Sequence, residues 1–247
     1  MTENNLDWQK TTKRFVAFFD IMGFKDMVQR STHQEILGKL ESLKELLKFL
    51  ENVTPENNKE LKKLNTEKYQ TRSVTFSDSI IFFSKSDKLE DLQKITADSY
   101  ALLNKALTRN IAIKGAIAYG DITVDFDNFL FFGQSIIDAY LLHEEIMFYG
   151  VVLDCSYEAK LKTMTTTAGF PDSVIANYRL PLKNGKATHK IIKPYKEAQR
   201  QQWIEALEQM FYSVAGRPRI YIDNTVEFLK SLDYQLPKKA AIEKPSD

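Results

Sequence analysis

Two aspartates stand at positions where a carboxylate could do chemistry. Asp20 ends the nearly continuous apolar run of residues 14–20 (RFVAFFD), and Asp78 is the centre of a Ser-Asp-Ser sequence between two β-rich pieces. Two carboxylates that are held close together repel each other unless a cation lies between them. Oxygen-only ligation suits Mg²⁺ or Mn²⁺, which keep water ligands and bind phosphates. Because two such ions can activate an attacking oxygen and stabilise a leaving pyrophosphate, Asp20 and Asp78 are candidate ligands of a two-metal phosphate site.

The segment that directly follows Asp20 is a candidate phosphate-binding segment, because it is expected to begin a helix. It consists of Ile21, Met22, Gly23 and Phe24. The first N–H groups of a helix lack partners within the helix, and they attract anions. We therefore expect the backbone of these four residues to face the phosphates.

Each aspartate also has a purely structural alternative. An aspartate at the end of a strand is often a turn or helix-capping residue, and Ser-Asp-Ser can be a plain hairpin turn. Spacing along the chain does not choose between these interpretations. The metal-site hypothesis depends on whether the fold brings the two carboxylates together.

The predicted elements would bring them together. Residues 14–20 predict a buried strand, and a capping box of Thr32 and Glu35 begins a helix that leucines at helical spacing continue to Val53. The following elements are a loop at 54–68, a hairpin at 72–83 with Asp78 at its tip, a helix at 89–107, a strand at 111–120, a second hairpin at 121–133, a helix at 134–147 and a strand at 150–154. This order predicts an α+β fold with a ferredoxin-like βαββαβ core, extended by a hairpin, a helix and a strand. In such a sheet the first strand lies beside the hairpin.

The ends of the chain complete the predicted organisation. An edge hairpin is expected around Asn184 and Gly185, followed by helices at 196–214 and 224–232. The polar residues 1–13 and 233–247 are expected to be flexible, on either side of a single domain at 14–232.

Composition excludes several classes of function. The 247 residues are 43% hydrophobic and 27% charged, with a net charge of +1, which gives no reason to expect a nucleic-acid or membrane surface. A single cysteine, Cys155, and three histidines exclude a disulfide framework and a Cys/His metal cluster. The N-terminus has no apolar signal segment and no run is long enough to span a membrane, so a cytoplasmic location is expected.

Four short motifs resemble, in order, those of the class III nucleotidyl cyclases. They are FFDIMGF around Asp20, FSDSIIFF around Asp78, KGAIAYGDI, in which Lys114 stands where arginine is usual, and FFGQSIIDAYLLHE, anchored by Gly133 and Ala139. The resemblance covers residues 14 to 155. It implies two Mg²⁺ or Mn²⁺ ions held by Asp20, Asp78 and the backbone carbonyl of Ile21. It also implies a nucleoside triphosphate substrate and a head-to-tail homodimer with sites between the chains.

The sequence departs from the family's pattern at the residues that bind the nucleotide base and at those that stabilise the transition state. The lysine and aspartate that read a purine base fall on Val74 and Leu130, and the family's transition-state asparagine and arginine fall on Ile137 and Leu141. Losing polar groups that read one base argues against ATP and GTP, or against activity altogether.

The same departures resemble the pyrimidine cyclases of Pycsar antiphage defence. FSDSI, the A-Y-x-L-x-E run from Ala139 to Glu144, and YIDNTVEFL from Tyr221 to Leu229 look like that branch. This resemblance implies conversion of UTP or CTP to the 3′,5′-cyclic monophosphate, read by a separately encoded effector. That effector is often a membrane protein or a TIR-domain NADase.

A basic residue must neutralise charge on the phosphates in such a reaction. Lys114 and Arg72 are the candidates, with Lys183 behind them, although a strand cation is more often a solvated surface residue. Tyr119 and Tyr140 are candidates for the base pocket or the dimer surface. His143 is expected to be surface or structural, and Cys155 is expected to be an inert buried thiol.

Three alternatives remain open on the sequence. One is an adenylate or guanylate cyclase, and the second is a degenerate cyclase-like domain that binds a nucleotide without turnover. The third is a palm-type nucleotidyltransferase or diguanylate cyclase. The last is disfavoured because FSDSI occupies the place of a G-G-D/E-E-F hairpin.

Overall fold

The computed structural model describes residues 8–52, 70–109, 111–164, 174–193 and 200–231. Its strands are β1 (Thr11–Ile21), β2 (Thr71–Phe76), β3 (Ser79–Ser84), β4 (Ile113–Asp125), β5 (Leu130–Gly133), β6 (Val151–Leu153), β7 (Ile175–Leu182) and β8 (Gly185–Ile192). Its helices are α1 (Phe24–Arg30), α2 (His33–Asn52), α3 (Leu89–Leu107), α4 (Gln134–Glu145), α5 (Cys155–Lys162), α6 (Arg200–Ser213) and α7 (Arg217–Ser231). The loop predicted at 54–68 and the tail at 233–247 lie outside the described residues.

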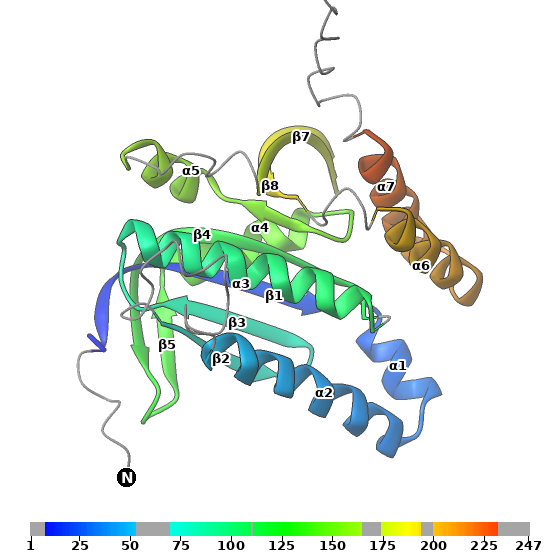
Figure 1. Cartoon of the computed structure of the whole chain (residues 1–247), viewed down its shortest axis with the longest axis horizontal. Coiled ribbons are helices and arrows are strands. Elements are labelled where there is room, and N and C mark those ends of the chain that lie inside the picture. Colours follow the sequence, from blue (N-terminus) through cyan, green and yellow to red (C-terminus); the bar gives the residue numbers. More distant parts are fainter. Residues whose placement is uncertain (1–7, 53–69, 110, 165–173, 194–199, 232–247) are drawn as a thin grey trace, which may run out of the picture.

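One sheet organises the chain, in the strand order β2-β3-β1-β4-β6-β8-β7, with β5 paired to β4 (Figure 1). The first four strands are antiparallel and have the order of a ferredoxin-like core, whereas β6 runs parallel to β4. The predicted α+β fold is therefore confirmed. The hairpin around Asn184 and Gly185 is also confirmed, as β7 and β8.

The two faces of the sheet are covered by different helices (Figure 1). Side chains alternate along a strand, so Phe15, Ala17 and Phe19 of β1 join the main core with the leucines of α2 and α3. Phe18 points the other way and packs with Ala139 of α4. Asp20 belongs to the same alternation as Phe18, which places its side chain on the α4 side.

Several boundaries differ from those predicted. β1 begins at Thr11 rather than at residue 14, because β4 is one strand of 13 residues that continues to pair with it beyond Gly120. Helix α7 begins at Arg217 rather than at Asn224, after Gly216 in a left-handed conformation (φ 68°). Helix α5 was not predicted, although Asp154 caps it by accepting a hydrogen bond from the Ser156 amide at 2.8 Å.

Close packing beside the candidate site requires glycine at position 115. A Cβ atom there would lie 2.4 Å from Phe19 Cδ1 and 2.7 Å from the Phe18 carbonyl oxygen. We expect Gly115→Ala to lower the free energy of unfolding by about 1–3 kcal/mol, because backbone and a buried ring would both have to move. Gly38→Ala is the matched control: a Cβ atom meets nothing within 4 Å in helix α2, so stability should rise by about 1 kcal/mol. Urea denaturation of both variants measures the difference, and equal effects would contradict this packing.

Within the described ranges, no helix combines the length and apolar content needed to cross a membrane.

Candidate active site

The fold places Asp20 and Asp78 side by side where β1 meets the β2–β3 hairpin. Asp20 pairs in register with Ser79, and the Ile21 amide donates a hydrogen bond to the Asp78 carbonyl oxygen at 2.9 Å. Burial and, second to it, the Asp78 charge together raise the pKa of the Asp20 carboxyl to about 6, while Lys114 opposes the rise. The two carboxylates therefore form a close, poorly compensated pair, as a bound cation would require.

The hairpin tip that carries Asp78 is conformationally strained. Phe76 pairs with Ser79, so Ser77 and Asp78 form a two-residue turn. Ser77 has a φ of 56°, a left-handed conformation that residues with a side chain rarely adopt. Two-residue turns of this kind fit the twist of the flanking strands, which explains why the strain is tolerated.

Lys114 lies on the other side of Asp20. The two residues pair in register between β1 and β4, and Lys114 is only 4% exposed. Burial lowers the pKa of its ammonium group, and the negative charges of Glu144 and Asp20 oppose that shift. Its Nζ atom lies 5.6 Å from the ring centroid of Tyr221. Lys114 is thus a buried cation held beside the carboxylate pair.

A cavity of about 660 Å³ opens beside this group of residues, within the range of small-molecule sites. Ile21, Met22 and Gly23 line one side of it, and Tyr149 and Tyr221 line another. The charged lining residues are Arg30, Lys39, Lys114, Lys183 and Arg217, together with the acids Asp26 and Glu144. The excess of cations fits an anionic ligand such as a chain of phosphates.

The structure narrows the expected contribution of residues 21–24. The Ile21 amide is bonded to Asp78, and the Met22 amide donates to the Ala112 carbonyl oxygen at 2.8 Å. Two of the four N–H groups are therefore committed to the sheet. Gly23, with a φ of 74°, and Phe24, the first residue of the seven-residue helix α1, remain as candidates to face phosphate.

Arg72 is not brought to the carboxylates. It lies on β2, two strands from β1, and pairs with Phe83, four residues along β3 from Ser79, so it is displaced from Asp20 by about 13 Å along the strand direction and by about 10 Å across it. Its guanidinium group stacks over the rings of Trp8 and Phe126, at 5.0 Å from each centroid. Of the two predicted basic residues, only Lys114 is near Asp20.

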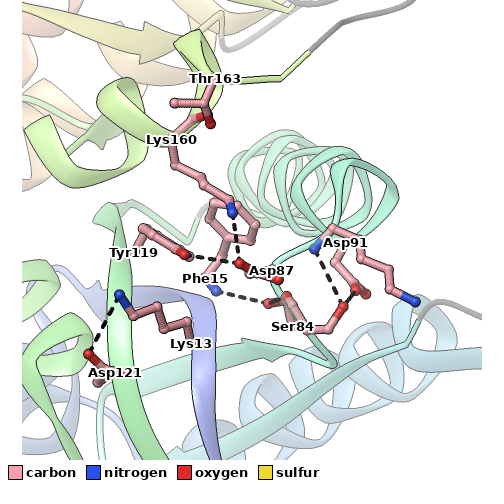
Figure 2. A network of polar contacts seen from close by, with 11 residues as sticks. Lys13, Phe15, Ser84, Asp87, Asp91, Tyr119, Asp121, Lys160 and Thr163 are labelled. Atoms are coloured by element: carbon pink, nitrogen blue, oxygen red, sulfur yellow. Dashed lines mark hydrogen bonds and ion pairs between the residues drawn. The ribbon is translucent and has the colours of Figure 1, made fainter.

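Tyr119 belongs to a polar network beside the middle of β4 (Figure 2). Its hydroxyl donates to Asp87 at 3.0 Å, and Lys160 of α5 reaches the same oxygen at 2.7 Å. Figure 2 shows both side chains converging on Asp87, while a separate pair, Lys13 and Asp121, lies to one side. The network ties the segment after β3 to α5, so Tyr119 has a structural role here rather than a place in the cavity.

The structure shows how deeply Cys155 and His143 are buried. The expected buried thiol at Cys155 is wrong: the residue is exposed, because β6 ends at Leu153 and Cys155 begins the surface helix α5. His143 is buried, its Nδ1 lies 2.6 Å from the Tyr140 carbonyl oxygen, and burial lowers the pKa of its ring. Its packing against Phe18 at 4.7 Å fits the structural role expected of it.

Several cavity residues could not be predicted from the sequence. Arg217 and Tyr221 come from α7, about a hundred residues after Lys114, and only the sheet topology brings them there. Glu144 and Tyr221 were noticed only as parts of a family pattern, not as neighbours of Asp20. No local spacing could have joined them.

The raised pKa of Asp20 has a measurable consequence for stability without metal. Its folded-state pKa of about 6 exceeds the ordinary 3.8, so the stabilising protonated form is lost as pH rises through about 6. Asparagine does not ionise. The unfolding free energy of Asp20→Asn, relative to wild type in EDTA, should therefore rise by about 1 kcal/mol between about pH 4 and pH 7.5, discounted for partial exposure. Denaturant titrations test this, with exposed Asp121→Asn as control, and a pH-independent difference would contradict it.

Comparisons with known proteins identify the fold. No protein-family model and no curated protein matches the sequence. Among solved structures, the chain is similar to the catalytic core of a rhodopsin-guanylyl cyclase with converted specificity in complex with ATPalphaS. The TM-score is 0.54 and the identity 12%, over 76% of this chain and 100% of the other. A bacterial light-regulated adenylyl cyclase gives a TM-score of 0.50 and 8% identity, over 81% and 99%. The fold is that of class III nucleotidyl cyclase catalytic domains.

Proposed function

We propose that the chain is a nucleotidyl cyclase that converts UTP or CTP to the 3′,5′-cyclic monophosphate and pyrophosphate. The observation that carries this proposal is the pair Asp20 and Asp78, beside buried Lys114 at the rim of a cation-lined cavity. The fold of cyclase catalytic domains supports it. By resemblance of the sequence motifs, the two aspartates match that family's metal positions.

The residues present fit a divalent cation. Among the described residues, no group of three or more His, Cys, Asp or Glu could hold a metal by itself. Mg²⁺ and Mn²⁺ do not need such a group, because they keep water ligands and share substrate phosphates. Asp20, Asp78 and, by resemblance, the carbonyl of Ile21 would hold two such ions. Those ions would activate the ribose 3′-hydroxyl and neutralise the phosphates.

The chain's own residues would orient the reaction. In-line attack of the 3′-oxygen on the α-phosphorus breaks the bond to the departing pyrophosphate, and positioning and charge supply most of the acceleration. Lys114 would compensate charge on the phosphates from a buried position, where its attraction is weakly screened. The amides of Gly23 and Phe24 would hold a phosphate oxygen, and Tyr149 and Tyr221 would exclude water from one wall.

The proposed preference for a pyrimidine base rests on the two positions at which purine cyclases bind the purine base. Val74 packs in an apolar cluster with Phe126 and Phe131, and Leu130 is 49% exposed on β5. Neither side chain can donate a hydrogen bond to a purine edge. A pyrimidine is therefore the favoured base, and by resemblance the product would be an antiphage second messenger read by a separately encoded effector in the cytoplasm.

Incubating the purified protein with each of the four ribonucleoside triphosphates and Mn²⁺ tests the proposal. Cyclic UMP or cyclic CMP with an equal amount of pyrophosphate is expected, identified by mass spectrometry and chromatography. Cyclic AMP or cyclic GMP with UTP and CTP untouched would remove the pyrimidine claim. Nucleotide binding without any product would instead support a degenerate domain, an alternative that apolar Ile137 and Leu141 favour.

A homodimer is the expected assembly, because α4 and β5 present apolar side chains to solvent. Ile137, Tyr140 and Leu141 of α4 are 50%, 46% and 56% exposed, and Leu130 and Phe132 of the contacting strand β5 are 49% and 56% exposed. Exposed apolar patches of this kind mark interaction surfaces. By resemblance to the class III cyclases, the active site would form between two chains, and the family's transition-state positions fall on Ile137 and Leu141 of this helix.

The double variant Ile137→Glu, Leu141→Glu should therefore be monomeric and should lose at least about tenfold in activity. Two charges in a desolvated apolar contact are strongly unfavourable. Light scattering after gel filtration measures the mass, and Phe49→Glu on α2, where Phe49 is 56% exposed, is the control. A double variant with the same mass as wild type would contradict this choice of surface.

A further inference from the structure

The helix pair α6–α7 lies outside the ferredoxin-like core, yet it walls the cavity. In Figure 1, β1 ends on the same side of the molecule as α1, α6 and α7. The cavity is lined by Met210 of α6 and, from the first turns of α7, by Arg217, Pro218 and Tyr221. The cavity is therefore lined by residues from both the N-terminal and the C-terminal part of the chain.

Helix α7 is held firmly in this position. The Tyr149 amide donates to Thr225 Oγ1 at 2.9 Å, and Asn224 Nδ2 donates to the Met147 carbonyl oxygen at 2.7 Å. Phe228 is fully buried against Tyr178, with ring centroids 4.5 Å apart. These contacts fix α7 to the segment before β6 and to β7, so its first turn has a defined place beside Lys114.

The aromatic wall links α7 to the candidate site. The rings of Tyr149 and Tyr221 stack with centroids 5.8 Å apart and an angle of 15° between their planes. Lys114 Nζ lies 5.6 Å from the Tyr221 centroid on this wall. Arg217 precedes Tyr221 by one helical turn, so both side chains lie on the same side of α7.

The charges in this corner are unbalanced. Within the described ranges, neither Arg217 nor Lys114 forms a salt bridge, and the hydrogen bond that Arg217 makes is to the Met147 sulfur, at 3.8 Å. The third cation, Lys183, is bonded to Glu144 at 3.1 Å. Two carboxylates, Glu144 and Asp20, thus face the three cations Lys114, Lys183 and Arg217. A thioether does not neutralise a guanidinium group, whereas phosphate oxygens match its donors well.

We infer that Arg217 of α7, together with Lys183, binds the phosphate chain of the ligand in this cavity, which makes the α6–α7 pair part of the binding site. The ligand class is a polyphosphate, free or carried by a nucleotide. The identification of this polyphosphate as part of a cyclase substrate rests on the function proposed above. The binding of phosphates by Arg217 and Lys183 does not depend on that function. Glu144 holds Lys183 until a phosphate replaces it.

Isothermal titration with inorganic tripolyphosphate in EDTA tests this inference without turnover. Arg217→Ala should weaken binding at least tenfold, and Arg217→Lys should recover part of the loss. Arg219→Ala is the matched control, because Arg219 is on the same turn but stacks on Phe211 at 4.4 Å and bonds to the Val214 carbonyl oxygen. It should change binding less than twofold. Thermal melts confirm that each variant is folded.

The outcomes separate this inference from the proposed function. If wild type cyclises a nucleotide while Arg217→Ala keeps both its tripolyphosphate affinity and its KM, the inference is overturned and the function stands. If tripolyphosphate binding depends on Arg217 but no nucleotide is cyclised, the inference stands and the function fails. Equal losses of tripolyphosphate affinity in Arg217→Ala and Arg219→Ala would show that binding depends only on the overall positive charge, and this result would also overturn the inference.

Discussion

The Asp20→Asn variant is expected to form cyclic nucleotide about a hundredfold to a thousandfold more slowly than wild type, the loss typical of removing one preorganised charge from a reacting site. Asparagine keeps the shape of the side chain and removes only the negative charge. Because the pKa of Asp20 is raised to about 6 by burial and by Asp78, the substitution also relieves a repulsion, so the fold should be retained. Initial rates of product formation with saturating Mn²⁺ measure the effect.

Asp78→Asn should lose as much, and the double variant should lose little more than either single one. Residues that act as a unit are strongly non-additive, since removing one already disables the other. Asp121→Asn is the control, because the Asp121 carboxylate is exposed and its ion pair is a long one, at 4.0 Å, with the exposed Lys13. A rate within threefold of wild type in either single variant would show that the carboxylates do not act together in turnover.

Lys114→Met is expected to lower kcat/KM by about a hundredfold. Methionine preserves the length of the buried side chain and its contact with Tyr221, while it removes the charge beside Asp20. The loss should therefore come from uncompensated charge on the phosphates rather than from a cavity. Steady-state kinetics with the preferred nucleotide measure it.

Lys114→Arg is the matched variant for this prediction. It keeps the cation, and arginine is the usual residue at this position in the family that the sequence resembles. Its kcat/KM should stay within about tenfold of wild type. Equal losses in Lys114→Met and Lys114→Arg would mean that packing, and not charge, is what position 114 supplies.

The parts of the fold that local sequence signals encode were predictable. The capping box is present: the Thr32 amide donates to Glu35 at 2.8 Å, and the Glu35 amide donates back to Thr32 Oγ1 at 3.3 Å. The hairpin of Asp78 and the strand of Asp20 followed from alternation and turn residues. Their proximity then followed from the order of the elements, because in a ferredoxin-like sheet these strands are neighbours.

Other features depend on contacts that no local pattern contains. β4 continues through Gly120 only because β1 pairs with it along its length, and sequence spacing suggested a break there. Arg72 looked equivalent to Lys114 as a strand cation, yet register placed it over Trp8 and Phe126. Arg217 entered the cavity through the docking of α7, which is determined by long-range contacts such as that between Tyr149 and Thr225.

The proposal that Asp20 and Asp78 share a cation is tested most directly by Mn²⁺ binding, measured from the electron paramagnetic resonance signal of the free ion. Wild type, Asp20→Asn, Asp78→Asn and the double variant would be titrated with and without the preferred nucleotide. Each single substitution should weaken Mn²⁺ binding at least about tenfold. The loss of Mn²⁺ binding free energy in the double variant should not exceed the sum of the losses in the two single variants. Mn²⁺ affinity equal to wild type in both single variants would contradict the account.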